Sequence, residues 1–156
     1  MIQTETGFNK NIMIAVDESE NARRAVSYVG RFLSGISGFK VLILHVIRQP
    51  EEDYFPTAAE KDRWLGEYKL KVDAMLKHYR EILIDEGLEP AGVSVRSTLR
   101  YCPSLAECIL AERNEMKCST IVVGRQGISR SEEFLFGSVS SKIVNHARDC
   151  TVWVVE

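Results

Sequence analysis

Five short apolar runs alternate with longer mixed segments along this chain. The runs cover residues 11–17, 39–47, 92–100, 119–124 and 151–155. The first two are largely continuous, which is typical of strands buried on both faces of a parallel sheet. The run at 92–100 alternates between apolar and polar residues, which is also typical of a strand. The apolar pattern therefore predicts five strands.

The segments between the runs carry apolar residues three or four positions apart, which predicts helices. These helices are expected at residues 19–35, about 57–86, 103–115 and 138–149. Ser19 and Ser138 are suited to cap the first and last helix, because a serine hydroxyl can accept a bond from a free first-turn amide. The predicted core face of the first helix is Ala22, Ala25, Val26, Val29, Phe32 and Leu33. That of the second is Leu65, Tyr68, Val72, Met75, Leu76, Tyr79, Ile82 and Leu83.

The alternation of strands and helices predicts a single-domain α/β fold, with a five-stranded parallel sheet and helices on both faces. Right-handed crossovers favour the open, Rossmann-like strand order 3-2-1-4-5. We expect the domain to cover residues 11–156, after a flexible tail at residues 1–10. In this order the first and fourth strands are neighbours, and ligands bind at the carboxyl ends of such strands. Asp17 and the stretch 124–142 are therefore predicted to face one crevice.

The composition is that of an ordinary globular domain, since 45% of the 156 residues are hydrophobic and 27% are charged. The net charge of −2 gives no basic excess, so we expect no nucleic-acid partner. No apolar run approaches the roughly 18–20 residues that span a bilayer. The first residues are polar and lack the apolar segment of a secretory signal. We therefore expect a cytoplasmic protein without membrane contact.

The cysteines are scattered along the second half of the chain. They are Cys102, Cys108, Cys118 and Cys150. None belongs to a C-x-x-C pair, and the histidines do not cluster with them. We therefore expect buried or half-buried thiols in a reducing compartment, and no metal site.

The stretch from residue 124 to 142, GRQGISRSEEFLFGSVSSK, carries the candidate ligand site. Gly124 follows the fourth strand, and Gly127 lies three residues later, so the backbone can turn there and direct amides toward an anion. Gly137 and Ser138 open the last helix, whose free amides and partial positive charge suit a phosphate. The alternative is that the glycines only form a turn and Ser138 only caps the helix.

The spacing Gly124-x2-Gly127-x9-Gly137-Ser138 resembles the ATP-binding motif of the universal stress protein family. The segments IMIAVDESENARRAV, VLILHVI, VVGRQG and FGSVSSKIVNHA also resemble that family, so the similarity extends over almost the whole chain. The resemblance implies an adenine nucleotide alpha hydrolase-like fold. It also implies that the chain binds ATP, or ADP or AMP, with or without Mg²⁺.

The resemblance further implies roles for individual residues. Asp17 would lie beside the adenine and ribose, the backbone of Val46 would meet the adenine edge, and Val123 would lie along the ribose. Gly127 and the backbone of residues 137–140 would hold the phosphates. The implied cofactor-binding set is Ala15, Asp17, Val46, Val123, Gly124, Gln126, Gly127, Gly137, Ser138, Val139 and Ser140. No catalytic residue is expected.

Several of these residues have a second interpretation. Asp17 could instead cap the following helix or act as a base, and His45 could be a core histidine or a catalytic one. Arg125 and Gln126 depart from the family pattern, in which a small residue precedes a basic one, so Arg125 points either to phosphate or to solvent. Lys142 could neutralise a phosphate or be solvated. The pair Glu132–Glu133 could help to hold a metal or be solvated as well.

The last run, residues 151–155, is an apolar strand at the predicted sheet edge, which favours pairing with a second copy. The resemblance implies the same, because universal stress proteins commonly dimerise through this strand, and Trp153 would be the anchor. The leading hypothesis is a cytoplasmic, ATP-binding homodimer that acts in stress response, with ATP as a regulatory ligand and little or no hydrolysis. The alternatives are a nucleotide-free interaction module that works through its dimer surface, and a weak ATPase.

Overall fold

The computed structural model describes residues 8–125 and 138–156. In these ranges the strands are β1 (Asn11–Ala15), β2 (Lys40–Arg48), β3 (Val93–Arg100), β4 (Thr120–Gly124) and β5 (Thr151–Val155). The α-helices are α1 (Glu20–Leu33), α2 (Ala58–Asp85), α3 (Leu105–Met116) and α4 (Ser138–His146). Short 3₁₀ helices lie at Glu52–Tyr54 and Pro90–Gly92. None of the helices described is both long and apolar enough to cross a membrane. The predicted alternation of strands and helices is confirmed.

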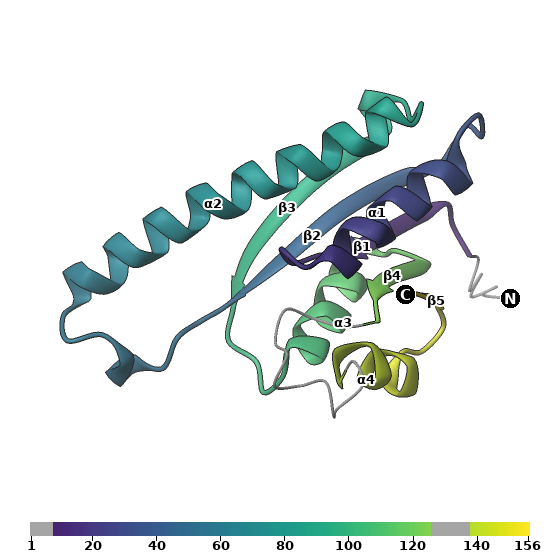
Figure 1. Cartoon of the computed structure of the whole chain (residues 1–156). Coiled ribbons are helices and arrows are strands. Elements are labelled where there is room, and N and C mark those ends of the chain that lie inside the picture. Colours follow the sequence, from purple (N-terminus) through teal and green to yellow (C-terminus); the bar gives the residue numbers. More distant parts are fainter. Residues whose placement is uncertain (1–7, 126–137) are drawn as a thin grey trace, which may run out of the picture.

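The strands form one parallel sheet in the order β3-β2-β1-β4-β5, as predicted (Figure 1). β1 is the central strand, and its Met13 is paired with Leu42 of β2 and with Ile121 of β4. Met13 and Ile14 are both fully buried. Such complete burial explains the continuous apolar run in the sequence, because helices cover both faces of the strand.

An apolar layer lies on each face of the sheet. On one face, Ile12 and Ile14 pack against buried residues of α1 and α2, among them Val26 and Leu76. On the other face, Met13 packs against buried residues of α3 and α4. The division follows from the strand itself, because successive side chains of a strand point to opposite faces. The expectation of helices on both faces is thus confirmed.

Hydroxyl side chains cap the amino ends of three helices. Ser19, Thr57 and Ser104 each accept a hydrogen bond from the backbone amide three residues later, at 3.1, 3.2 and 3.3 Å respectively. Gly87, with a φ of +105°, ends α2 in a conformation that glycine adopts without strain. The cap predicted at Ser19 is therefore confirmed. The residue before Ser138 lies outside the described residues, so the cap predicted at Ser138 remains a prediction.

The chain is anchored to the sheet from Asn9 onward. The Asn9 amide donates to the hydroxyl of Ser119, and its side-chain nitrogen donates to the carbonyl of Lys117, both at 2.7 Å. These bonds join the residues before β1 to the residues before β4. Asn9 is therefore bonded to the rest of the domain before β1 begins.

The prediction that Phe32 faces the core is wrong. Its side chain is 51% exposed and lies at the side of α1, next to the edge strand β5. There it packs against Trp153, with ring centroids 5.1 Å apart, and against Tyr28, at 5.9 Å. Helical spacing alone does not distinguish a residue that faces the core from one that packs at the edge of the sheet, because both lie on the side of the helix that contacts the protein. We call Tyr28, Phe32 and Trp153 the edge aromatic cluster.

The expectation of four free thiols is wrong for one pair, since Cys102 and Cys108 form a disulfide. The loop after β3 brings their Cα atoms within 5.8 Å of each other, a separation that suits a disulfide. Their spacing of six residues gave no sign of this, because the bond depends on how the loop turns into α3. Cys118 is a buried free thiol and Cys150 a partly buried one.

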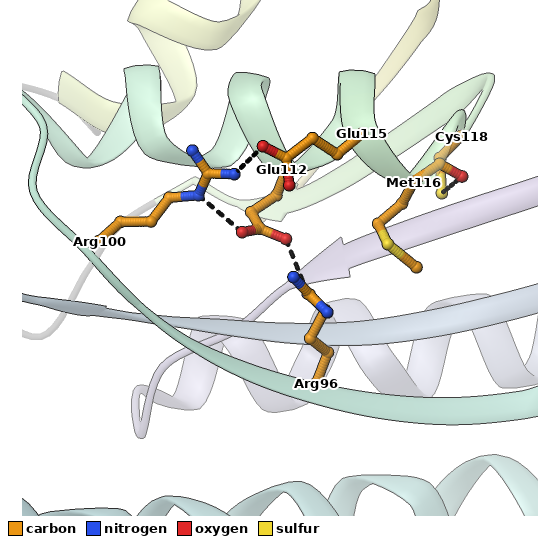
Figure 2. Close-up of polar contacts among 6 residues, drawn as sticks. All are labelled: Arg96, Arg100, Glu112, Glu115, Met116 and Cys118. Carbon is orange, nitrogen blue, oxygen red and sulfur yellow. Dashed lines mark hydrogen bonds and ion pairs between the residues drawn. The ribbon is translucent and has the colours of Figure 1, made fainter.

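A buried carboxylate joins α3 to the edge strand β3 (Figure 2). Glu112 is fully buried and accepts hydrogen bonds from the Nε atoms of Arg96, at 2.8 Å, and Arg100, at 2.6 Å. Arg100 also pairs with Glu115. Arg96 and Arg100 lie four residues apart, and therefore on the same face of β3. A buried charge is tolerated only when it is paired in this way.

Replacing Glu112 with glutamine should lower the free energy of unfolding by about 3 kcal/mol, because it removes the charge that two arginines face. The matched control is Glu115→Gln on the exposed side of the same helix, which should cost less than about 1 kcal/mol. Chemical denaturation of both variants measures the difference. If both variants lose the same free energy of unfolding, burial does not strengthen the interaction of Glu112 with the two arginines.

The same carboxylate should make stability depend on acidity. Burial by itself raises the pKa of Glu112, but the bonds from Arg100 and Arg96 outweigh it and hold the pKa below its ordinary value of 4.5. The stabilisation is therefore complete above that value and is lost as the pH falls through the lower pKa of the folded protein. Denaturation curves below pH 5 should show a smaller loss in Glu112→Gln than in the unmodified protein.

Candidate functional site

The carboxyl ends of β1 and β4 lie side by side at the centre of the sheet. Ala15 is paired with Val123, so Gly124 ends β4 beside the segment that leads from Ala15 to Asp17. Val46 lies two residues beyond Leu44, the partner of Ala15 on β2, and therefore extends past the end of β1 at the same sheet edge. The fold thus brings together predicted site residues from three separate parts of the sequence.

Asp17 is held in place by both its side chain and its backbone. One carboxylate oxygen accepts a hydrogen bond from the backbone amide of Ser19 at 2.8 Å, which closes the turn into α1. Its carbonyl oxygen accepts a bond from the hydroxyl of Tyr79 at 2.6 Å. Ser19, and not Asp17, is the N-cap of α1, so Asp17 does not cap the helix itself but orients the residue that does. Such a bond uses one oxygen of the carboxylate and fixes its orientation at the sheet edge.

Tyr79 and Tyr68 reach this edge from α2, and the sequence did not reveal their role. Burial, followed by the nearby charge of Asp17, raises the pKa of Tyr79 to about 12. Burial also raises the pKa of Tyr68, and the nearby negative charges of Glu18 and Asp17 raise it further. Both hydroxyls therefore remain donors at neutral pH. A signal was available, because tyrosine on an apolar helix face needs a polar partner when it is buried.

His45 is a core histidine with both ring nitrogens engaged. It is only 7% exposed, and its Nδ1 lies 2.7 Å from the carbonyl oxygen of Val16. Since a carbonyl can only accept, Nδ1 carries the proton, and Nε2 then accepts from the hydroxyl of Tyr68 at 3.2 Å. The structural interpretation of His45 is thus favoured over the catalytic one. Together His45 and Tyr79 fix the segment that leaves β1.

A row of aromatic rings continues outward from His45 toward the start of α2. Tyr68 stacks on Trp64, with ring centroids 5.1 Å apart and an angle of 5° between the planes. Trp64 in turn lies 5.5 Å from the ring of Phe55, in the segment before α2. This row supports the bond between Tyr68 and His45, because stacking limits the positions that the tyrosine ring can take.

Gly124 is required by the packing of α1 on β4. A Cβ atom at this position would lie 2.9 Å from the backbone carbon of Asn21 and 3.0 Å from its oxygen. Distances this short are excluded, so any side chain would push the first turn of α1 away from β4. The glycine was predicted to allow close approach of a ligand. The structure adds a second close approach, by the protein's own backbone.

The first turn of α4 is bonded to the end of β4. Ser140 is buried, and its hydroxyl donates to the carbonyl of Arg125 at 3.3 Å. Ser138 and Val139 are partly buried beside it, and Val139 packs against the core on that face of the sheet. The nine-residue helix α4 therefore has its first turn next to the strand ends described above, at the same edge of the sheet.

The side chain of Arg125 is directed toward the end of β5. Its guanidinium pairs with Glu156 at 2.8 Å, and its backbone amide donates to the carbonyl of Val155, also at 2.8 Å. Its departure from the family pattern therefore coincides with a bond to the C-terminal strand. Lys142 is exposed on α4, as expected of a solvated lysine.

Part of the predicted site lies outside the described residues: Gln126, Gly127 and Gly137, together with Glu132 and Glu133. Their assignments remain predictions. Within residues 8–125 and 138–156, no three histidine, cysteine, aspartate or glutamate side chains lie close enough together to hold a metal ion.

Similarity to known proteins was found over nearly the whole chain. The model of the universal stress protein family matches residues 9–156. A putative universal stress protein of Staphylococcus aureus strain USA300 is 32% identical over 154 residues, which cover 94% of this chain and 83% of that protein.

Two solved structures share the fold. One is a universal stress protein in complex with cAMP, with a TM-score of 0.69, 21% identity and coverage of 94% of this chain and 96% of the other. The other is the universal stress protein of Archaeoglobus fulgidus in complex with dAMP, with a TM-score of 0.62, 19% identity and coverage of 94% and 97%.

Replacing Gly124 with alanine should destabilise the protein by about 1–3 kcal/mol, because the added methyl group collides with the backbone of Asn21. The matched control is Gly66→Ala on the exposed surface of α2, where a Cβ atom meets nothing within 4 Å. There the change should stabilise the helix by roughly 0.5–1 kcal/mol. Thermal or chemical denaturation measures both values. A neutral Gly124→Ala would contradict the close approach of α1.

Proposed function

This chain belongs to the universal stress protein family, and on that premise we propose that it binds ATP as a regulatory ligand at the carboxyl ends of β1 and β4. The single observation that carries the proposal is the convergence of Asp17, Gly124 and the first turn of α4 at one edge of the sheet. These residues are far apart in sequence. Ligands of open α/β sheets bind where such strand ends meet.

The chemistry of this edge suits an adenine nucleotide. Asp17 offers a carboxylate that can accept bonds from ribose hydroxyls, and in this proposal the backbone of Val46 meets the adenine edge while Val123 lies along the ribose. The start of α4 offers backbone amides and a partial positive charge, which favour phosphate oxygens. In this proposal Gly127, Gly137 and the backbone of residues 138–140 hold the phosphates. The complexes of two structural neighbours with cAMP and dAMP lend support.

Regulation by the ligand is favoured over catalysis. His45 has both ring nitrogens engaged, and Asp17 uses one oxygen to close the turn into α1. In the part of the chain that the structure describes, both side chains are thus engaged in holding the segment that leaves β1. We therefore propose a stress-response protein of the cytoplasm in which ATP, with or without Mg²⁺, changes conformation or partner choice, with little or no hydrolysis.

The proposal includes a homodimer formed through β5. This strand lies at the sheet edge and presents Val154, which is 43% exposed, and beside it the edge aromatic cluster forms a shallow hollow with Val154 and Val155. Exposed backbone groups and apolar side chains together favour antiparallel pairing with a second copy. The same surface supports the second candidate function, a nucleotide-free interaction module.

Mg-ATP should raise the melting temperature of the purified protein. A ligand at 100 times its Kd stabilises by about 2.7 kcal/mol, or roughly 5–10 °C for a chain of this size. Gly127→Val should abolish the shift without changing the melting temperature of the free protein. Gly66→Val, on exposed α2, should keep the shift.

The same melts separate the candidate functions. If no adenine nucleotide at millimolar concentration moves the melting temperature, nucleotide binding is excluded and the interaction module is favoured. GTP serves as the control for base selectivity. Phosphate release faster than about one per minute would instead favour the weak ATPase, since enzymes typically turn over at 1 to 10³ per second.

Val154→Asp should convert the dimer into a monomer, because it places a charge on each copy at the centre of the paired strands. The matched control is Val144→Asp on α4, which is 53% exposed and does not belong to the edge strand. Sedimentation or light scattering at several concentrations measures the mass of each. A Val154→Asp protein that remains dimeric would show that β5 is not the interface.

A further inference from the structure

The disulfide between Cys102 and Cys108 joins two sulfurs of unequal exposure. Cys102 lies in the loop between β3 and α3 and is partly exposed, whereas Cys108 lies in α3 and is fully buried. A small molecule in solution can therefore reach the sulfur of Cys102 more readily than that of Cys108. The pair lies at the start of α3, just after β3 ends.

This disulfide is expected to add little to the stability of the fold. It closes a loop of six residues, and the stabilisation expected from a disulfide is smallest for short loops. Glu112, one turn after Cys108, already joins α3 to β3 through Arg96 and Arg100. The protein also has an apolar layer on each face of its sheet. A chain of this kind does not need a covalent staple, so the bond can open while the domain remains folded.

The surroundings of Cys102 favour its reaction as a thiolate. It lies two residues before Ser104, the cap of the twelve-residue helix α3. The amino end of a helix carries a partial positive charge, which favours a neighbouring anion. Cys118 is the opposite case, because burial raises the pKa of its thiol. Cys150, the other free thiol, has no cysteine partner among the described residues.

We propose that Cys102 and Cys108 form a reversible thiol–disulfide site that exchanges with small disulfides of the glutathione class. In the oxidising direction, the Cys102 thiolate attacks one sulfur of glutathione disulfide and forms a mixed disulfide, and the displaced glutathione thiolate takes a proton. Cys108 then loses its proton and attacks the Cys102 sulfur, which expels the second glutathione. Two protein thiols are oxidised and one glutathione disulfide is reduced to two thiols.

The reverse reaction uses the same order of access. A glutathione thiolate attacks the more exposed Cys102 sulfur, and Cys108 leaves as a thiolate that is protonated. A second glutathione thiolate then attacks the glutathione sulfur of the mixed disulfide and leaves as glutathione disulfide, while the released Cys102 thiolate takes a proton. Cys102 is therefore the entry point in both directions, and Cys108 is the resolving cysteine.

The test is a titration of the full chain in buffers of varied glutathione to glutathione disulfide ratio, followed by acid quench, alkylation and peptide mass spectrometry. In the unmodified protein the Cys102–Cys108 disulfide should convert fully to two alkylated thiols as the buffer becomes reducing, and return on oxidation. Cys108→Ala should trap one glutathione on Cys102. Cys102→Ala should leave Cys108 unmodified.

Circular dichroism establishes that each variant is folded, and an unmodified Cys118 shows that the buried regions stayed closed. If Cys108→Ala does not fold, brief exposure of the reduced, unmodified protein to glutathione disulfide replaces it, and the mixed disulfide should then appear on Cys102. The proposal is overturned if Cys108 accepts glutathione as readily as Cys102. It is equally overturned if Cys102 stays unmodified, or if the pair never opens or never closes.

Discussion

The carbonyl groups of the buried Val16 and the partly buried Asp17 follow the central strand, and each accepts a hydrogen bond from another element. His45 of β2 supplies one bond and Tyr79 of α2 supplies the other. A buried carbonyl without a partner would cost about 1–3 kcal/mol. These two bonds therefore determine where the chain leaves β1, and with it the position of Asp17 and the direction of α1.

The remaining geometry of the site edge follows from the direction in which the chain leaves β1. Once α1 starts at Ser19, its first turn passes so close to the end of β4 that only glycine fits at position 124. The end of β4 in turn holds the first turn of α4 through Ser140. The outer strands are stabilised differently, since β3 is joined to α3 by a buried carboxylate, whereas β5 rests on aromatic rings that stay partly exposed.

Most of the fold was predictable because its signals are local. Continuous apolar runs, helical spacing and Ser19 at a helix start each depend on neighbours in sequence, and crossover handedness then leaves one natural strand order. The Glu112 network, the Cys102–Cys108 bond and the exposure of Phe32 depend on which elements meet, and local patterns do not record that. Gly124 was found, but the part that Asn21 plays in requiring it was visible only in three dimensions.

The two tryptophans of the chain stand at separate places, and each reports on a different event. Trp64 stacks on Tyr68, whose hydroxyl bonds to His45 beside the site edge. Trp153 lies in the edge aromatic cluster on β5. The intrinsic fluorescence of this protein is therefore the sum of two signals, one sensitive to the environment of the sheet's carboxyl edge and one to whatever covers its last strand. Replacing Trp153 would leave Trp64 as a single fluorescent probe of the carboxyl edge, and replacing Trp64 would leave Trp153 as a probe of β5.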